Sequence, residues 1–187
     1  AALDPASKYR RWYQWSSPGT DLDAISATGT PAWHAQGRQH YLGVFTGAMP
    51  DLDFDNPAVR QEMVRIGRYW LEKGVDGFRV DAVQHVYLDF KADTDNPRIL
   101  AKNIAWLTQF RAGMNGVNPH AYIVGEVTQP SAEKLAPYFK PLSAVFDFPL
   151  AEKLIDSARQ ERNDGLAQLL GHIDSTYRAT PGRSGVD

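Results

Sequence analysis

Two acidic residues stand at the ends of short, strand-like runs: Asp81 in residues 77–83 and Glu126 in residues 122–127. A helix-length segment separates the runs, and such a unit normally forms two parallel strands side by side, about 4.8 Å apart. Acids at matching strand ends would then hold their carboxyl groups roughly 5–6 Å apart. A nucleophile and a general acid about 5–5.5 Å apart cleave glycosidic bonds with retention of configuration, so the spacing predicts sugar chemistry.

The residues around these two acids fit different roles. Arg79 shares a strand face with Asp81, and a neighbouring cation favours the ionised carboxylate that a nucleophile requires. Glu126 lies among apolar residues of its own strand, which favours the protonated form that a general acid requires. On these residues alone, the favoured interpretation is a structural Arg79–Asp81 ion pair and an exposed Glu126 at a strand end.

The segments around the two strands predict the supporting elements. Asn56 and Pro57 form a helix start, and the helix is expected to end at Lys73, with apolar residues Val59, Met63, Ile66 and Trp70 along one face. Further helices are predicted over 98–112 and 131–139 and within 150–178, where 163–165 interrupts the pattern. A third strand is predicted over 144–148, and loops over 91–97 and 180–187.

Strands that alternate with helices predict the α/β class with a parallel sheet. Three strands are too few for a closed barrel of eight, so the sheet is either small and open or part of a barrel. Residues 1–50 differ, because they are irregular and rich in aromatic residues, with a short strand plausible over 40–45. We therefore predict an irregular domain over 1–50 and an α/β region over 51–187.

The composition is that of an ordinary globular protein, with 187 residues, 43% hydrophobic and 22% charged. A net charge of −2 gives no reason to expect nucleic acid or an anionic membrane as a partner. No apolar run approaches the ~20 residues of a membrane span. The absence of cysteine excludes disulfides but does not fix the compartment; a secreted or periplasmic bacterial protein is favoured.

Aromatic residues in the first fifty positions suggest a second kind of sugar contact. Trp12, Trp15, Trp33 and Tyr41 could stack on the flat apolar faces of sugar rings. The alternative is that they form the small core of an irregular domain, and for most of them this is the favoured interpretation. Trp33 and Tyr41 remain candidates for substrate binding.

An acidic run at the start of the predicted helix mimics a calcium-binding loop. Asp51, Asp53, Asp55 and Glu62 occupy positions 1, 3, 5 and 12 of an EF-hand pattern. The loop requires glycine at its sixth position, where this chain has Asn56 followed by a proline. A strand end that runs into a helix cap is therefore the better interpretation of these residues.

The nine residues 77–85, Gly-Phe-Arg-Val-Asp-Ala-Val-Gln-His, resemble the nucleophile-bearing strand of the α-amylase family, glycoside hydrolase family 13. Gly-Glu-Val at 125–127 resembles its general-acid strand, and Met-Pro-Asp-Leu-Asp at 49–53 the motif that closes its inserted loop domain. Phe-Asp-Phe-Pro-Leu at 146–150 is similar to the segment after its sixth strand. The resemblance implies part of a (β/α)₈ TIM barrel, from fourth strand to sixth helix, preceded by much of the loop domain.

The resemblance also implies roles for individual residues. Asp81 matches the nucleophile, Glu126 the general acid/base and Arg79 the residue that orients the nucleophile. His85 matches a site-lining position whose backbone contributes to a structural Ca²⁺ site, and Asp51 matches a ligand of that calcium. The implied activity is hydrolysis or transfer at α-glucosidic bonds of α-glucans or maltooligosaccharides.

The chain departs from the family pattern at two points. Gln84 stands where many amylases carry a lysine that touches the sugar, which argues against ordinary endo-amylase specificity. The third-strand segment with His and Asn and the seventh-strand Asn-His-Asp segment do not occur. We therefore expect a partial barrel with little activity by itself. The alternatives are a non-catalytic, amylase-like module that binds or scaffolds carbohydrate, and a small α/β domain of unrelated function.

Overall fold

The computed structural model describes residues 4, 6–26, 28–87, 96–163 and 165–180. The chain forms two compact units, one of residues up to Met63 and one of most residues from Val64 onwards. The domain boundary predicted between residues 50 and 51 lies earlier in the sequence than the division between these two units, which follows Met63. Residues 51–53 stay with the first unit because their backbone pairs with it: Gln14 N–H donates to the Asp51 carbonyl at 3.2 Å and Asp53 N–H to the Trp12 carbonyl at 2.7 Å.

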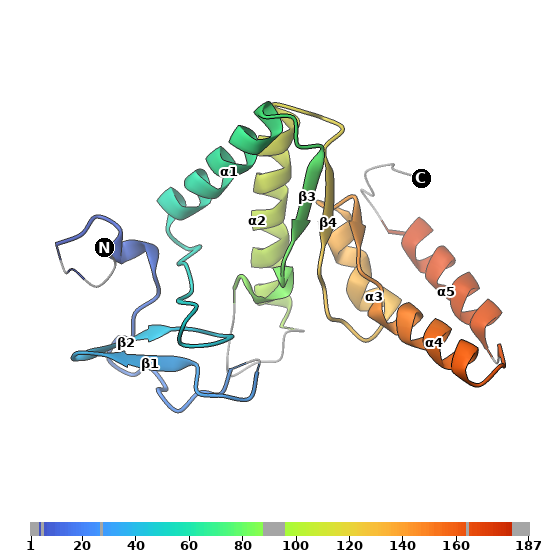
Figure 1. Ribbon diagram of the computed structural model, residues 1–187, viewed down its shortest axis with the longest axis horizontal. Coiled ribbons are helices and arrows are strands. Elements are labelled where there is room, and N and C mark those ends of the chain that lie inside the picture. The colour runs from blue at the N-terminus through green and yellow to red at the C-terminus, as the bar shows by residue number, and fades with distance from the viewer. Residues whose placement is uncertain (1–3, 5, 27, 88–95, 164, 181–187) are drawn as a thin grey trace. The chain divides into compact units, whose positions relative to one another are not determined.

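A parallel sheet organises the second unit. Its strands are β3 (Gly77–Val80), β4 (Tyr122–Gly125) and β5 (Ala144–Val145), in the order β3-β4-β5. Figure 1 shows β4 beside β3, with α2 running alongside them. The predicted parallel α/β sheet is thus confirmed. The strands are shorter than predicted, and after β3 the chain turns at Asp81 and Ala82.

Helices connect these strands and follow them. They are α1 (Pro57–Glu72), α2 (Pro97–Asn115), α3 (Ala132–Leu135), α4 (Phe148–Arg159) and α5 (Leu166–Arg178), and α3 continues as a 3₁₀ helix, Ala136–Phe139. Asn96 caps α2 through a 2.9 Å bond from the Arg98 N–H, with proline at the first helical position. The predicted helices are confirmed. Within the described residues, no helix is long and apolar enough to cross a membrane.

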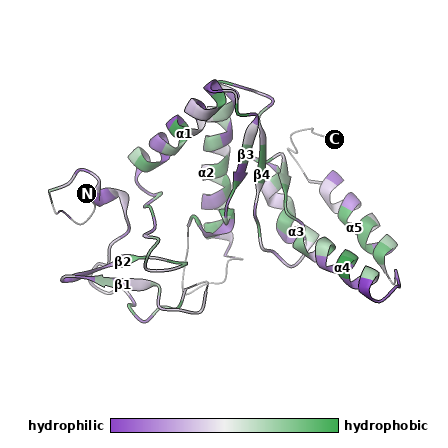
Figure 2. Cartoon of the chain, in the orientation of Figure 1, coloured by the Kyte–Doolittle hydropathy of each residue, from purple (hydrophilic) through white to green (hydrophobic). Residues whose placement is uncertain are grey.

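The core of the second unit lies between the sheet and α2. The fully buried side chains of this unit include Val83, Asn103, Leu107, Met114, Ile123, Val127, Leu135, Tyr138 and Leu142. The Phe110 ring meets Phe78 of β3 edge-on, with 5.9 Å between ring centroids. In Figure 2, hydrophobic and hydrophilic residues alternate along α2, as expected for a helix with one face on a sheet.

The apolar face predicted for α1 is wrong in its second half. Val59 is buried, but Ile66 is 37% exposed and Trp70 50%. Gly67 is buried instead, and a Cβ there would lie 2.7 Å from the Met114 sulfur. The helix therefore approaches α2 through a glycine, which a periodicity of large apolar residues does not reveal.

Arg111 of α2 ties the loops before β4 and β5 together. Its Nε donates to the Pro141 carbonyl at 2.9 Å, Nη1 to the Ala121 carbonyl at 2.6 Å and Nη2 to the Ser143 hydroxyl at 2.7 Å. Burial lowers the pKa of the guanidinium. One cation thus satisfies three acceptors at the edge where two strands begin.

We expect Arg111→Met to lower the free energy of unfolding by about 3–5 kcal/mol, because charged-group hydrogen bonds are lost and their acceptors stay without donors. Urea denaturation followed by circular dichroism measures the change. The matched control is Arg178→Met, which removes an exposed pair with Asp174 one helical turn away and should cost less than about 0.5 kcal/mol. Equal losses of unfolding free energy in the two variants would contradict the stabilising role of the three Arg111 hydrogen bonds.

A short antiparallel hairpin organises the first unit. It consists of β1 (Trp33–Gln36) and β2 (Gln39–Leu42), paired from Trp33↔Leu42 to Gln36↔Gln39. The strand predicted over 40–45 thus ends at Leu42, and its partner was not predicted. Ala32, Leu42 and Val44 form a small buried core beside the hairpin.

Candidate active site

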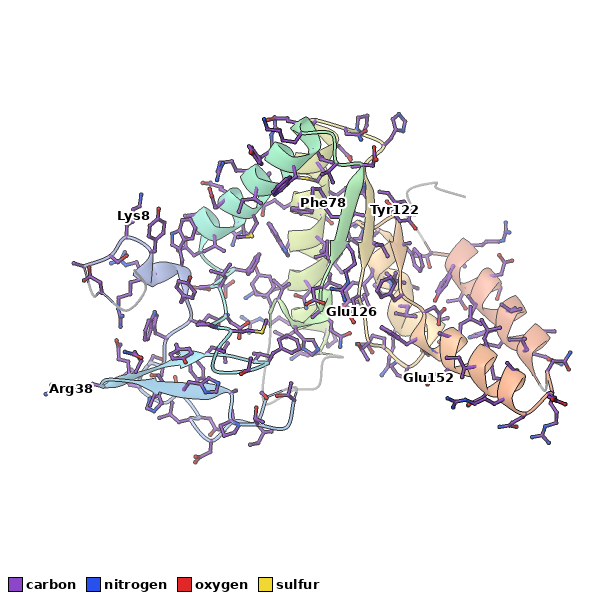
Figure 3. The ribbon with its side chains drawn as sticks, viewed as in Figure 1. Lys8, Arg38, Phe78, Tyr122, Glu126 and Glu152 are labelled. Carbon is purple, nitrogen blue, oxygen red and sulfur yellow. The ribbon has the colours of Figure 1, made fainter. Side chains whose placement is uncertain are left out.

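The pairing of β3 with β4 places the two predicted catalytic acids next to each other. Val80 is opposite Gly125, so Asp81 and Glu126 are the first residues after each strand. Backbone bonds extend the pairing through this point, since Glu126 N–H donates to the Val80 carbonyl at 2.9 Å. Figure 3 shows the Glu126 side chain at this end of the strands. The carboxyl ends of parallel strands are where α/β folds carry their functional side chains.

Arg79 holds both acids. Its Nη1 lies 2.5 Å from Asp81 Oδ1 and its Nη2 lies 2.7 Å from Glu126 Oε2. A hydrogen bond with the Glu126 carboxyl lowers the pKa of Asp81; slight burial opposes this shift, and attraction to Arg79 adds to it. The predicted stabilisation of ionised Asp81 is therefore present, with Glu126 as its largest cause and Arg79 contributing.

The surroundings of Glu126 differ from those predicted. Its backbone neighbours Gly125 and Val127 are buried, but its carboxyl group reaches out of that apolar layer to Arg79, and Asp81 bonds to it. The shared guanidinium explains the difference, because it draws both side chains toward one cation. The predicted spacing of roughly 5–6 Å between the carboxyl groups stays a prediction.

The residue after Asp81 has an unusual backbone conformation. Ala82 is left-handed, with φ +42°, although it has a Cβ. This turn lets the next residue, Val83, donate its N–H to the Glu126 carbonyl at 3.1 Å. A non-glycine residue in this region costs about 1–2 kcal/mol and commonly marks a functional site.

We expect Ala82→Gly to leave the stability unchanged or raise it by up to about 1 kcal/mol, because relief of backbone strain outweighs the extra freedom of the unfolded chain. Ala151→Gly, in the ordinary helical backbone of α4, should instead lose about 0.5–1 kcal/mol. Chemical denaturation of both variants tests the difference. A similar loss in both would mean that the Ala82 conformation carries no strain.

Gln84 and His85 come together in a buried cluster beside Asp81. Gln84 is only 5% exposed, and its Nε2 lies 3.2 Å from His85 Nε2. Asn103 of α2 donates to the Gln84 carbonyl at 2.9 Å and accepts the Tyr87 N–H at 3.0 Å. Burial lowers the pKa of His85. In this arrangement the Gln84 side chain faces protein, and its predicted contact with substrate stays a prediction.

Asn103 is the residue of this cluster that the sequence did not single out. It is 1% exposed and joins α2 to the loop after β3. An asparagine among Leu100, Ile104 and Leu107 on a helix face is a signal that could have pointed to it, because a buried amide needs hydrogen-bond partners.

Trp33 and Tyr41, the predicted sugar-stacking residues, belong to the hairpin of the first unit. They are partly buried, and the Tyr41 hydroxyl donates to the Gly47 carbonyl at 2.7 Å. The Tyr41 ring also packs against Trp15 edge-on and against His34. These contacts are those of a small core, and a role in substrate binding stays a prediction.

The predicted calcium ligands do not form a metal site within the described residues. Asp51 Oδ2 accepts the Val44 N–H at 2.6 Å, and burial raises the pKa of Asp51 against the effect of that bond. His85 belongs to the other unit. No group of three His, Asp or Glu side chains suited to a metal occurs in the described part of the chain. Ca²⁺ takes six or more oxygen ligands, which can include backbone carbonyls, and calcium binding by Asp51 and His85 stays a prediction.

The acidic run before α1 adopts the helix start that was favoured over an EF-hand. Asp53 Oδ1 accepts the Asp55 N–H at 3.0 Å, and Asn56 Oδ1 accepts the Ala58 N–H at 2.9 Å. These oxygens satisfy backbone donors ahead of the first helical turn, as capping residues do.

Comparisons with known proteins agree with this geometry. The family model of the alpha-amylase catalytic domain matches residues 1–179. Alpha-amylase 3 of Dictyoglomus thermophilum is 37% identical over 164 residues, and a trehalose synthase/amylase of Mycolicibacterium smegmatis is 31% identical over 183. These matches cover 88% and 89% of this chain and 30% of each relative.

The alpha-amylase structure from H. orenii superposes with a TM-score of 0.81 at 36% identity, covering 97% of this chain and 35% of that one. The chain thus spans about a third of the length of the proteins it resembles. The chain belongs to the alpha-amylase family, and its parallel sheet with adjoining helices is part of the family's (β/α)₈ catalytic barrel.

Proposed function

We propose that the chain carries the nucleophile and the general acid for hydrolysis or transfer at α-glucosidic bonds. The observation that carries this proposal is the parallel register that places Asp81 and Glu126 side by side after β3 and β4, with Arg79 Nη1 2.5 Å from Asp81 Oδ1 and Nη2 2.7 Å from Glu126 Oε2. The neighbouring Glu126 carboxyl and the Arg79 guanidinium lower the pKa of Asp81, which favours the ionised form that a nucleophile requires. Glu126, at the matching end of the neighbouring strand, is then placed to act as the general acid.

The proposed reaction uses Asp81 as the nucleophile and Glu126 as the general acid. Glu126 donates its proton to the glycosidic oxygen, and the Asp81 carboxylate attacks the anomeric carbon, so that the leaving sugar departs and a glycosyl ester forms. Ionised Glu126 then takes a proton from water, or from a hydroxyl of another sugar, as that oxygen displaces Asp81. Both configurational inversions occur at one carbon, so the product retains the original configuration.

Arg79 positions the pair before substrate arrives. It holds one oxygen of each acid, and nearly half of its side chain is exposed, so it can remain with Asp81 while Glu126 turns toward a substrate oxygen. A planar guanidinium with several donors suits this task, because it orients two carboxylates at once.

The substrates we propose are α-glucans or maltooligosaccharides. Support comes from the relatives, whose names include alpha-amylase and trehalose synthase/amylase. A non-catalytic module is less favoured, because both carboxylates and the arginine that joins them are in place.

A chimera tests the proposal. Residues 1–179 of this chain would replace the matching segment of the H. orenii alpha-amylase, whose structure the chain follows closely. We expect the chimera to hydrolyse maltooligosaccharides with retention, and the 187-residue chain alone to show little turnover. A folded chimera without activity would favour the non-catalytic module, and efficient turnover by the chain alone would refute the expected need for further barrel strands.

A further inference from the structure

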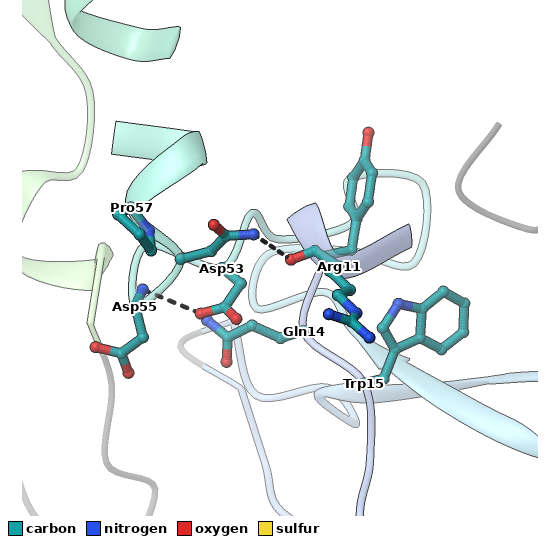
Figure 4. A pocket seen from close by; sticks show the side chains of 8 residues that line it. Arg11, Gln14, Trp15, Asp53, Asp55 and Pro57 are labelled. Atoms are coloured by element: carbon teal, nitrogen blue, oxygen red, sulfur yellow. Dashed lines mark hydrogen bonds between the residues drawn. The ribbon is translucent and has the colours of Figure 1, made fainter. Parts of the chain in front are cut away.

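A pocket in the first unit is independent of the residues assigned to catalysis. It has a volume of about 650 Å³ and is lined by Arg11, Tyr13, Gln14 and Trp15 on one side and by Asp53 and Asp55 on the other. Figure 4 shows the labelled side chains from these two segments around the same space. The volume lies within the range of roughly 300–1,000 Å³ typical of small-molecule sites.

The two walls of the pocket are fixed to each other by hydrogen bonds. Tyr13 forms an antiparallel bridge with Leu52. The Asn56 side chain donates to the Arg11 carbonyl at 2.8 Å. The pocket is therefore built by paired backbone segments and is formed before any ligand arrives.

Several polar groups that face this pocket are available to a ligand. Asp53 uses Oδ1 to accept the Asp55 N–H. Within the described residues, no hydrogen bond or ion pair engages Asp53 Oδ2, the Gln14 side-chain amide or the Arg11 guanidinium. The pocket thus offers a carboxylate acceptor, an amide with both functions and a cationic donor.

Trp15 supplies an aromatic surface in a fixed orientation. Its indole N–H donates to the Arg10 carbonyl at 3.0 Å, and the Arg10 guanidinium lies 3.9 Å from the ring centroid. Tyr41 meets the ring edge-on, at 6.3 Å between centroids. A ring held in this way presents its remaining surface to the pocket at little entropic cost.

The chemistry of the lining selects one class of ligand. Two carboxylates and one guanidinium give the lining a net negative charge, which disfavours phosphate and other anions. No group of three metal-ligating side chains occurs in the described part of the chain, which leaves a divalent cation without a ligand set. Mixed donors and acceptors beside aromatic carbon match hydroxyl groups that alternate with apolar C–H faces. We propose that this pocket binds a neutral saccharide.

Nuclear magnetic resonance titration of the 187-residue chain tests the proposal without any catalytic readout. We expect maltotriose to shift the Trp15 indole N–H signal in a saturable way, and the double variant Arg11→Ala/Gln14→Ala to weaken binding at least about tenfold. The matched control, Arg38→Ala, removes the same charge from the turn between β1 and β2 and should bind like the parent chain.

The outcomes separate clearly. Saturable binding that the double variant weakens, with an unchanged unfolding midpoint, supports the site. No binding of maltotriose, equal binding by the double variant, or tighter binding of inorganic phosphate than of maltotriose would each overturn it. Since none of the varied residues is in the catalytic set, failure here leaves the proposed catalysis untouched.

Discussion

Asp81→Asn, introduced into the chimera that carries this chain's residues 1–179, is expected to lower kcat/KM for maltooligosaccharides on the order of 10⁴-fold or more. The amide is not a nucleophile of useful strength, so the glycosyl ester cannot form, and losing a nucleophile removes most of an enzyme's rate enhancement. Because 69% of the Asp81 side chain is exposed, the fold should tolerate the change. Initial rates and a denaturation curve on the same sample measure both effects.

The control for this substitution lies at the other end of the same strand. Asp76 directly precedes β3 and is exposed, so Asp76→Asn makes the same chemical change away from the acids. It should keep kcat/KM within about twofold of the parent chimera. If the two variants lost activity equally, Asp81 would have no special role, and the nucleophile would have to be sought elsewhere.

Glu126→Gln tests the role of Glu126 as general acid, because the loss of activity should depend on the leaving group of the substrate. A general acid is needed most when the leaving group is a poor one, so the loss should be large, about 10²–10⁴-fold, for maltooligosaccharides. It should be much smaller for an aryl maltoside whose phenolate leaves without protonation. Equal losses on the two substrates would argue that Glu126 only holds Arg79 in place.

The parallel sheet and the two acids could be predicted because local sequence determines both. Each strand is a short apolar run that ends in an acid, and the right-handed crossover through α2 makes neighbours of the two strands. Because each run ends in its acid, parallel pairing brings Asp81 and Glu126 to one edge of the sheet, and the observed register makes them neighbours. The Asn56-Pro57 pair likewise predicted the helix start at Pro57, and the second helix, predicted from residue 98, begins one residue earlier at Pro97.

Features that depend on contacts between distant segments could not be predicted in this way. The path of Arg79 to both carboxyl groups, the cluster of Gln84 with His85 and the burial of Asn103 all require knowing which side chains meet. The approach of α1 to α2 through Gly67 was missed because a residue without a side chain adds nothing to an apolar pattern.

Gly77→Ala is expected to be the most destabilising single-methyl change in the sheet, with a loss of about 3 kcal/mol or more. An ideal Cβ at Gly77 would lie 1.9 Å from the Tyr122 carbonyl oxygen and 2.7 Å from its carbonyl carbon. These are backbone atoms of the paired strand β4, so no rotamer change relieves the clash. The start of β3 would have to separate from β4, and the hydrogen bonds there would be lost.

For a domain of this size, such a loss lowers the thermal midpoint by roughly 6–12 °C. The control is Gly171→Ala in α5, where a Cβ meets nothing within 4 Å and the backbone is helical. That change should raise stability by up to about 1 kcal/mol, because alanine favours helix more than glycine does. Opposite signs from the same methyl group would show that close backbone approach, and not side-chain volume alone, fixes the pairing of β3 with β4. Since that pairing aligns Asp81 with Glu126, similar stabilities for the two variants would also undermine the register on which the catalytic assignment rests.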